Sequence, residues 1–256
     1  MKKRLLSFVL IIILLTNCKA EEVGIEDEDH VYPQTFVDLE GKSLQDLFPN
    51  ASEKLLSDWT GLLEGAKIVT VSLVKKYYVW DKKKSKYVAS NIESDNTTNQ
   101  NTINLYTIVS EKTLENNKKG CLIIGSFEQN LNTSNILNLT PLLGFSLASS
   151  SNETIRSNSD TGVVHFEDRD YNVPITTVFA GLVWQNKMDN GIPSSGTFSM
   201  ILNEINLNEE PKGIYSRLDI ELDPRENNQF LYSLTGSQLN IDRSSDLTIS
   251  NETRLD

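Results

Sequence analysis

The chain has 256 residues, 38% of them hydrophobic, and a formal net charge of -11. This length suits one large β domain or two small ones, and the excess of carboxylates argues against nucleic acid and anionic lipid surfaces as partners of the folded part. Because the only cysteines are Cys18 and Cys121, a disulfide framework is excluded.

The chain begins with the pattern of an export signal. Three cations at residues 2–4 precede an apolar run from Leu5 to Leu15, which only Ser7 interrupts. A membrane-spanning helix needs about 20 apolar residues to cross roughly 30 Å of hydrocarbon, so this run is too short to remain as a span. Residues 1–17 are therefore predicted to be a signal peptide.

The sequence Leu15-Thr16-Asn17-Cys18 resembles the lipobox of bacterial lipoproteins, and the beginning MKKRLL…TNCK is similar to that of spirochaete lipoproteins. The resemblance is confined to residues 1–20, and Asn17 stands where most bacterial lipoboxes have Gly or Ala. It implies that Cys18 receives a diacylglyceryl group and acyl chains such as palmitate. It further implies a protein anchored in the cell envelope, at the surface or the periplasmic face of the outer membrane. Ordinary secretion with cleavage after Ala20 is the alternative.

Residues 18–35 are predicted to form a solvated tether after the lipidated N-terminus. Carboxylates crowd this stretch and core-forming residues are nearly absent from it, so it cannot bury enough apolar surface to offset its ordering entropy. A cluster of carboxylates with His30 could bind a divalent cation, but runs of charge are usually only solvated.

One amphipathic helix is predicted near residues 51–64. Asn50 and Glu53 have the spacing of a capping box, and Gly65 follows the helix end. Apolar residues recur at helical spacing between them: Leu55, Leu56, Trp59, Leu62 and Leu63. We expect this apolar stripe to pack on a sheet.

The remainder of residues 36–256 is predicted to be a single β-rich domain. Val, Ile, Thr, Tyr and Phe collect in short runs between clusters of turn-forming residues. The predicted strands are residues 67–80, 87–89, 103–109, 121–127, 142–147, 163–166, 176–184, 197–205, 214–222, 230–234, 239–241 and, more weakly, 247–249. Parallel strands would need a crossover helix after each one, so about ten strands and one helix predict an antiparallel β-sandwich or barrel. Cys121 falls within one of these runs and is expected to be buried.

Residues 214–222 alternate most clearly, which predicts one buried face and one wet face. Asp219, Glu221 and Asp223 would share the wet face and are weak candidates for a metal site. Alternate residues on a strand lie about 7 Å apart, however, and Arg217 supplies a cation on the same face. A solvated, partly self-neutralised strand face is the preferred interpretation.

No motif in the sequence identifies an enzyme. His165 and Glu167 would share a strand face, but the histidine pairs of zinc sites, the Gly-x-Ser-x-Gly elbow and the phosphate-binding glycine loops are absent from the sequence. His165 is therefore expected to be a structural histidine. We expect no cofactor and no catalytic residue.

Aromatic residues allow one further interpretation, a barrel that carries a small apolar ligand. The residues that could line such a pocket are Trp59, Trp80, Trp184, Tyr77, Tyr78, Phe179 and Phe198. Aromatic residues of this kind more often fill a protein core. The sequence favours a membrane-anchored lipoprotein whose β-rich domain binds an envelope or host protein or supports the envelope. The apolar carrier is the alternative, followed by a metal-dependent enzyme.

Overall fold

The structure is a computed structural model that describes residues 34–36, 42–90, 101–114, 117–132, 134, 136, 139–150, 161–178, 181–189, 191–203, 212–224, 229–235 and 238–255. All of these residues belong to one compact unit, Val31–Asp256. Within these ranges, no helix has the length and apolar character needed to cross a bilayer. The predicted signal peptide and most of the predicted tether lie outside the described residues.

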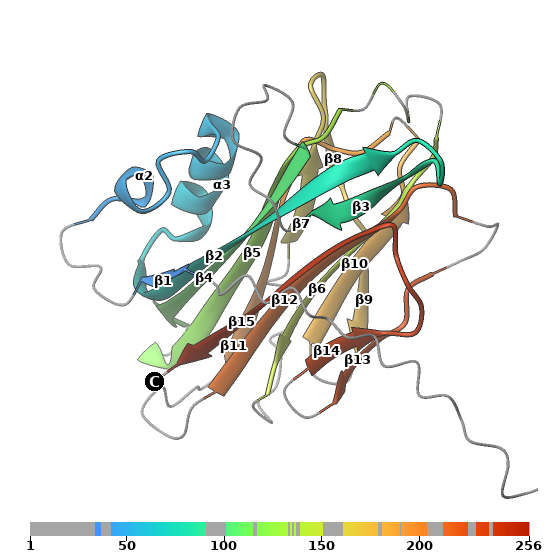
Figure 1. Ribbon diagram of the computed structural model, residues 1–256. Helices are drawn as coiled ribbons and strands as arrows, with labels where there is room; N and C mark the ends of the chain where they lie inside the picture. Colours follow the sequence, from blue (N-terminus) through green and yellow to red (C-terminus); the bar gives the residue numbers. More distant parts are fainter. Residues whose placement is uncertain are drawn as a thin grey trace, which may run out of the picture. The chain divides into compact units, whose positions relative to one another are not determined.

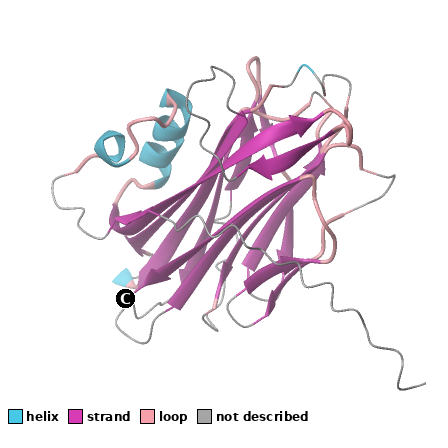
Figure 2. Cartoon of the chain, viewed as in Figure 1, coloured by secondary structure: helices cyan, strands magenta, loops and turns pink. Residues whose placement is uncertain are grey.

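Two antiparallel sheets form the body of the molecule (Figures 1 and 2). The larger sheet has the order β1 (Gln34–Phe36), β2 (Ala66–Asp81), β4 (Asn101–Thr113), β5 (Lys119–Asn130), β11 (Ser195–Asn203), β7 (Thr161–His165) and β8 (Asp170–Asn172), and β3 (Lys86–Ser90) also pairs with β2. The smaller sheet has the order β15 (Leu247–Leu255), β12 (Lys212–Glu221), β6 (Leu142–Ser149), β10 (Gly181–Lys187) and β9 (Ile175–Val178). Neither sheet closes on itself, so the fold is a β-sandwich and not a barrel.

Side chains from both sheets fill the space between them. Phe145 of the smaller sheet stacks on Phe198 of the larger sheet with ring centroids 4.2 Å apart, and Trp184 lies 5.3 Å from Phe198. Gly162 lies under the Trp184 ring, where an added Cβ would come within 2.3 Å of the indole. Cys121 is fully buried in the same core, as predicted. These described aromatic residues therefore pack the core, and the open sheets are not the barrel of the carrier interpretation; Phe179 of the predicted aromatic set lies outside the described residues.

A polar seam crosses the sandwich core. The side-chain amide of Asn251 in β15 donates to Ser72 in β2 at 2.6 Å and to Thr107 in β4 at 2.9 Å. Ser72 also contacts Thr253 at 2.7 Å, and Thr107 contacts Ser216 of β12 at 2.7 Å. All five side chains are buried, so the seam fixes how the two sheets are aligned.

Two helices, α2 (Leu44–Leu47) and α3 (Glu53–Leu62), cover the outer face of the larger sheet (Figure 1). Helix α3 is the predicted helix, and its apolar stripe packs on the sheet as expected. Trp59 is fully buried, and its ring lies 5.3 Å from Phe48 and 5.2 Å from Tyr106. The predicted cap was wrong, because Ser52 rather than Asn50 accepts the hydrogen bond of an N-terminal amide.

The strand predictions were correct in outline and wrong in detail. Residues 176–184 form two strands rather than one, since Val178 of β9 pairs with Gly181 of β10. Strand β7 ends at His165, so Glu167 does not share a strand face with it. The last strand, β15, is nine residues long because polar residues that face the seam extend it beyond the predicted 247–249.

A third layer corrects the predicted wet face of residues 214–222. The hairpin of β13 (Tyr232–Thr235) and β14 (Gln238–Ile241), together with Phe230, packs over the outer face of the smaller sheet. Tyr215 and Asp219 point into this layer and are buried. Both faces of β12 are therefore covered. The alternation of apolar and polar residues predicted that the polar face of β12 is exposed. In the structure the hairpin covers this face, and Tyr232 of the hairpin donates a hydrogen bond to Asp219.

Candidate functional site

The described residues contain two clusters of charged side chains that are at least partly buried. One lies between α3 and the larger sheet around His165, and the other lies beneath the β13–β14 hairpin around Asp219. A catalytic site built on either cluster would need a reactive group that its neighbours leave available.

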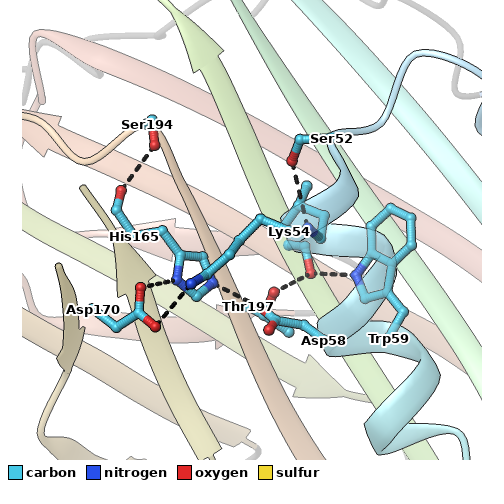
Figure 3. A network of polar contacts seen from close by, with 10 residues as sticks. Ser52, Lys54, Asp58, Trp59, His165, Asp170, Ser194 and Thr197 are labelled. Carbon is cyan, nitrogen blue, oxygen red and sulfur yellow. Dashed lines mark hydrogen bonds and ion pairs between the residues drawn. The ribbon is translucent and has the colours of Figure 1, made fainter. Parts of the chain in front are cut away.

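The first cluster joins three separate segments of the chain (Figure 3). His165, the last residue of β7, places Nδ1 2.9 Å from Oδ1 of Asp170 in β8 and Nε2 2.7 Å from Oδ2 of Asp58 in α3. Lys54, one turn before Asp58, places Nζ 2.9 Å from Oδ2 of Asp170. We call these four side chains the His165 cluster.

When the ring of His165 is protonated, both of its nitrogens donate to these carboxylates, because an ionised carboxylate only accepts hydrogen bonds. Burial would lower the pKa of His165, but the hydrogen bonds and charges of Asp58 and Asp170 outweigh this effect and raise the pKa. The hydrogen bond from His165, followed by the one from Lys54, lowers the pKa of Asp170. With the ring protonated, two cations and two carboxylates neutralise one another.

This arrangement does not have the geometry of a catalytic triad. The hydroxyl of Ser194 donates to the backbone carbonyl of His165 at 3.0 Å and does not contact the ring. A general base needs a free nitrogen within reach of the proton that it accepts. Carboxylates contact both ring nitrogens, so neither nitrogen faces a hydroxyl that it could deprotonate.

The His165 cluster instead fixes α3 on the sheet. Neighbouring polar contacts do the same. The indole Nε1 of Trp59 donates to Ser126 of β5 at 2.9 Å, and Glu128 of β5 accepts from the backbone amide of Ser52 at 3.2 Å. Ser126 lies 3.4 Å from Thr197 of β11. The helix is therefore held by directional contacts as well as by its apolar face.

The second cluster contains the residues that the sequence suggested as weak metal ligands. Asp219 is fully buried and accepts two hydrogen bonds from Arg217 at 2.8 and 3.1 Å. It also accepts from the hydroxyl of Tyr232 at 3.1 Å and from that of Ser245 at 2.8 Å. Its oxygens are thus already engaged.

The other two candidates lie apart from Asp219. Glu221 forms an ion pair with Arg243 at 2.7 Å, and Asp223 is exposed. Within the described ranges, no three side chains of His, Cys, Asp or Glu converge as metal ligands would. The structure thus places these three carboxylates in separate surroundings.

Sequence reasoning missed three members of the His165 cluster. Asp58 and Lys54 fall within the predicted helix, and Asp170 falls between two predicted strands, but none of the three was singled out. A separation of 107 residues divides Asp58 from His165, and spacing along the chain gives no signal for such a contact. The predicted lipidation site, Cys18, lies outside the described residues.

Comparison with known proteins finds only remote likenesses. No family model matches the chain, and no curated protein sequence matches it. A structure concerned with pH-induced modulation of Streptococcus parasanguinis adhesion by Fap1 fimbriae is 9% identical, covers 72% of this chain and 94% of that one, and has a TM-score of 0.33. The collagen binding domain of the Erysipelothrix rhusiopathiae surface protein RspB is 8% identical, covers 71% of this chain and 76% of that one, and has a TM-score of 0.29.

A third likeness is the T6 backbone pilin of serotype M6 Streptococcus pyogenes. It is 12% identical, covers 75% of this chain and 61% of that one, and has a TM-score of 0.30. These three are surface proteins of bacteria. With TM-scores this low, none of them informs the function of this chain, and the proposal below is argued from its own residues.

Proposed function

We propose that this chain is a bacterial envelope lipoprotein, lipidated at Cys18, whose β-sandwich acts by binding an envelope or host component rather than by catalysis. The observation behind the proposal is the run from Leu5 to Leu15 followed by Leu15-Thr16-Asn17-Cys18 and an acidic stretch. Each buried methylene contributes about 0.8 kcal/mol to membrane affinity, so a protein with two or more acyl chains is held stably. The outer membrane is the proposed location.

The folded part supports a binding role. In both charged clusters, the His165 cluster and the one around Asp219, groups that could do chemistry are neutralised by partners in the same fold. Such groups stabilise a scaffold and leave binding to the surface. A β-sandwich can present loops and hairpins for that purpose.

Labelling of the two cysteine variants tests the anchor. In cells grown with labelled palmitate, the wild-type chain and the Cys121→Ala variant are expected to incorporate label, and the Cys18→Ser variant is not. Cys121→Ala is a matched control, because it removes the other cysteine of the chain, which is buried in β5. In envelope fractionation, the Cys18→Ser chain is expected to leave the membrane pellet.

Mass spectrometry of the mature protein decides between lipidation and ordinary secretion. The proposal requires a modified Cys18 at the N-terminus. An unmodified N-terminus at Glu21 would reject it in favour of cleavage after Ala20. Protease treatment of intact cells then assigns the face: loss of the domain indicates a host or environmental partner, and protection indicates a periplasmic one.

A further inference from the structure

The hairpin formed by β2 and β3 differs in charge from the rest of the molecule. Residues 75–86 contain six lysines and one carboxylate, Asp81, in a chain whose formal net charge is -11. Four of these lysines surround the turn and are exposed: Lys82, Lys83, Lys84 and Lys86. The negative net charge of the chain predicts repulsion from anionic surfaces, but this hairpin is locally positive and would be attracted to them.

The turn that presents the lysines is ordered by its own backbone contacts. Asp81 Oδ1 accepts from the amides of Lys83 at 2.8 Å and Lys84 at 3.2 Å. Within the described part of the chain, the contact of Lys84 with Asp81 at 4.0 Å is the only ion pair that the four turn lysines form. Among the described residues, the turn therefore carries more lysines than carboxylates that pair with them.

An exposed apolar pair lies next to these lysines. Val79 is 53% exposed and pairs directly with Val88 of β3, which is partly buried. Side chains of directly paired residues lie on the same face of a sheet. Large exposed aliphatic residues are few in the described chain, and this one borders the basic turn.

The base of the hairpin is anchored firmly to the sandwich. The hydroxyl of Tyr87 donates to the carbonyl of Asn132 at 2.6 Å, and that of Tyr78 donates to the carbonyl of Thr248 at 2.6 Å. Trp80 packs on Tyr87 with ring centroids 5.0 Å apart. Figure 1 shows that the hairpin turn lies at the edge of the sandwich, away from α2 and α3. The lysines and Val79 thus lie on a rigid, protruding edge.

From this combination we infer that the β2–β3 hairpin docks on an anionic phospholipid bilayer, with the turn lysines at the headgroups and Val79 and Val88 at the interface. A protruding edge with cations beside aliphatic side chains matches a flat, negatively charged surface that has an apolar interior. A soluble polyanion would offer charge but no place for the valines. The inference rests on the proposed lipid anchor, which would hold the hairpin near such a surface.

The tether is long enough for this contact. Fifteen residues lie between Cys18 and Gln34, where β1 begins, and the sixteen residue steps of this chain span at most about 55 Å when extended. Gln34 pairs with Leu73, and the ten residues of β2 and its turn from Leu73 to Lys83 cover only about 33 Å. Chain length therefore does not prevent the turn from reaching the bilayer in which Cys18 would be anchored.

The test uses the mature chain from residue 18 onward with Cys18→Ser, so that neither the predicted signal peptide nor a lipid anchor contributes to binding. Sedimentation is compared between vesicles of phosphatidylcholine alone and vesicles that also contain phosphatidylglycerol. We expect binding only to the anionic vesicles, weakened by added salt. Because each lysine near an anionic leaflet raises the partition coefficient about fivefold, Lys82→Gln with Lys83→Gln should lower it about 25-fold.

A matched control is the pair Lys118→Gln with Lys119→Gln. It removes the same charge from the opposite end of the sheet, since Lys119 pairs with Thr113 at the far end of β4 from the hairpin. Its partition coefficient is expected to change less than twofold. Equal loss in the two double variants, or equal binding to both kinds of vesicle, would overturn the inference.

A third comparison separates a bilayer from a soluble polyanion. Val79→Ser should weaken binding to anionic vesicles and leave any binding to dextran sulfate unchanged. If the chain binds dextran sulfate and Val79→Ser has no effect on vesicle binding, the hairpin is a polyanion site and the bilayer inference is wrong. Because Cys18 is replaced throughout, these outcomes are independent of the palmitate result that tests the anchor.

Discussion

At the scale of single residues, the charge of His165 determines how firmly α3 is attached. The protonated ring donates to Asp58 and Asp170 together, whereas a neutral ring has one N–H and can donate to only one of them. A hydrogen bond to a charged group contributes about 1.5–3 kcal/mol. Loss of the proton would also leave Lys54 as the single cation beside two carboxylates.

The stability of the domain should therefore fall as pH rises. The pKa of His165 is raised above 6.5 in the folded protein, so its contribution is complete below the unfolded value and is lost as pH rises through the folded value. We expect the free energy of unfolding in urea to fall across this transition by about 1.4 kcal/mol for each unit by which the folded pKa exceeds the unfolded one. The His165→Gln variant should lose this slope.

The second histidine of the chain provides the control. His30→Gln removes a histidine of the predicted tether, and the pH slope should remain. A slope retained in His165→Gln would contradict the assignment. On the acid side, the lowered pKa of Asp170 means that its contribution is present above 3.8 and is lost as pH falls through the folded value.

At the scale of elements, helices α2 and α3 form a layer with its own apolar core. Trp59, Phe48 and Tyr106 make the centre of this layer, which is separated from the main core by the larger sheet. Loss of contacts here should loosen the helices before it affects the interior of the sandwich. The helical layer is thus a candidate for local unfolding.

Replacement of Trp59 tests this independence. Trp59→Ala removes a fully buried ring and its hydrogen bond to Ser126, and should cost about 3–5 kcal/mol of stability. Hydrogen exchange is expected to accelerate at the amides of α3 far more than at those of β10, which faces away from the helices. The exposed neighbour Thr60→Ala is the control and should change stability by less than about 0.5 kcal/mol.

Prediction from sequence succeeded for elements whose pattern is local. Leu55 and Trp59 have helical spacing, and long runs of β-branched residues indicated β2, β4 and β5 correctly. The one-turn helix α2 is too short to give a periodic signal. The burial of Asp219 was unpredictable from β12 alone, because it depends on a hairpin that follows later in the chain.

The charged clusters were less predictable than the strands for the same reason. A contact such as that of Asp58 with His165 exists only after the helix has docked on the sheet, and it leaves no spacing in the sequence. The basic turn is different. Its lysines lie close together in the sequence, at residues 82–84 and 86. The negative net charge of the whole chain was used as the guide to its partners, so this local positive charge was not considered.

At the scale of the whole molecule, the polar seam determines how the two sheets align. Apolar side chains allow many sliding arrangements of two sheets, whereas the amide of Asn251 needs the positions of Ser72, Thr107 and Thr253 for its hydrogen bonds. Buried polar groups that lose their partners are costly. The seam therefore favours a single alignment of the sandwich.

Asn251→Ala should destabilise the whole domain by about 1–3 kcal/mol, because Ser72 and Thr107 each lose a buried donor. A shift of the urea midpoint, read from far-ultraviolet circular dichroism, measures the effect. The exposed Asn172 of β8 provides the control, and Asn172→Ala should leave the midpoint nearly unchanged. An equal midpoint in the two variants would show that the seam does not contribute.

The burial of Cys121 has a practical consequence for studying this molecule. Its thiol lies inside the sandwich with no exposed surface, so maleimide reagents should not reach it in the native state. In a Cys18→Ser chain, a cysteine introduced at Ser85 would then be the single reactive position. A fluorophore attached there would report directly, through its change in colour and intensity, on the polarity around the hairpin tip.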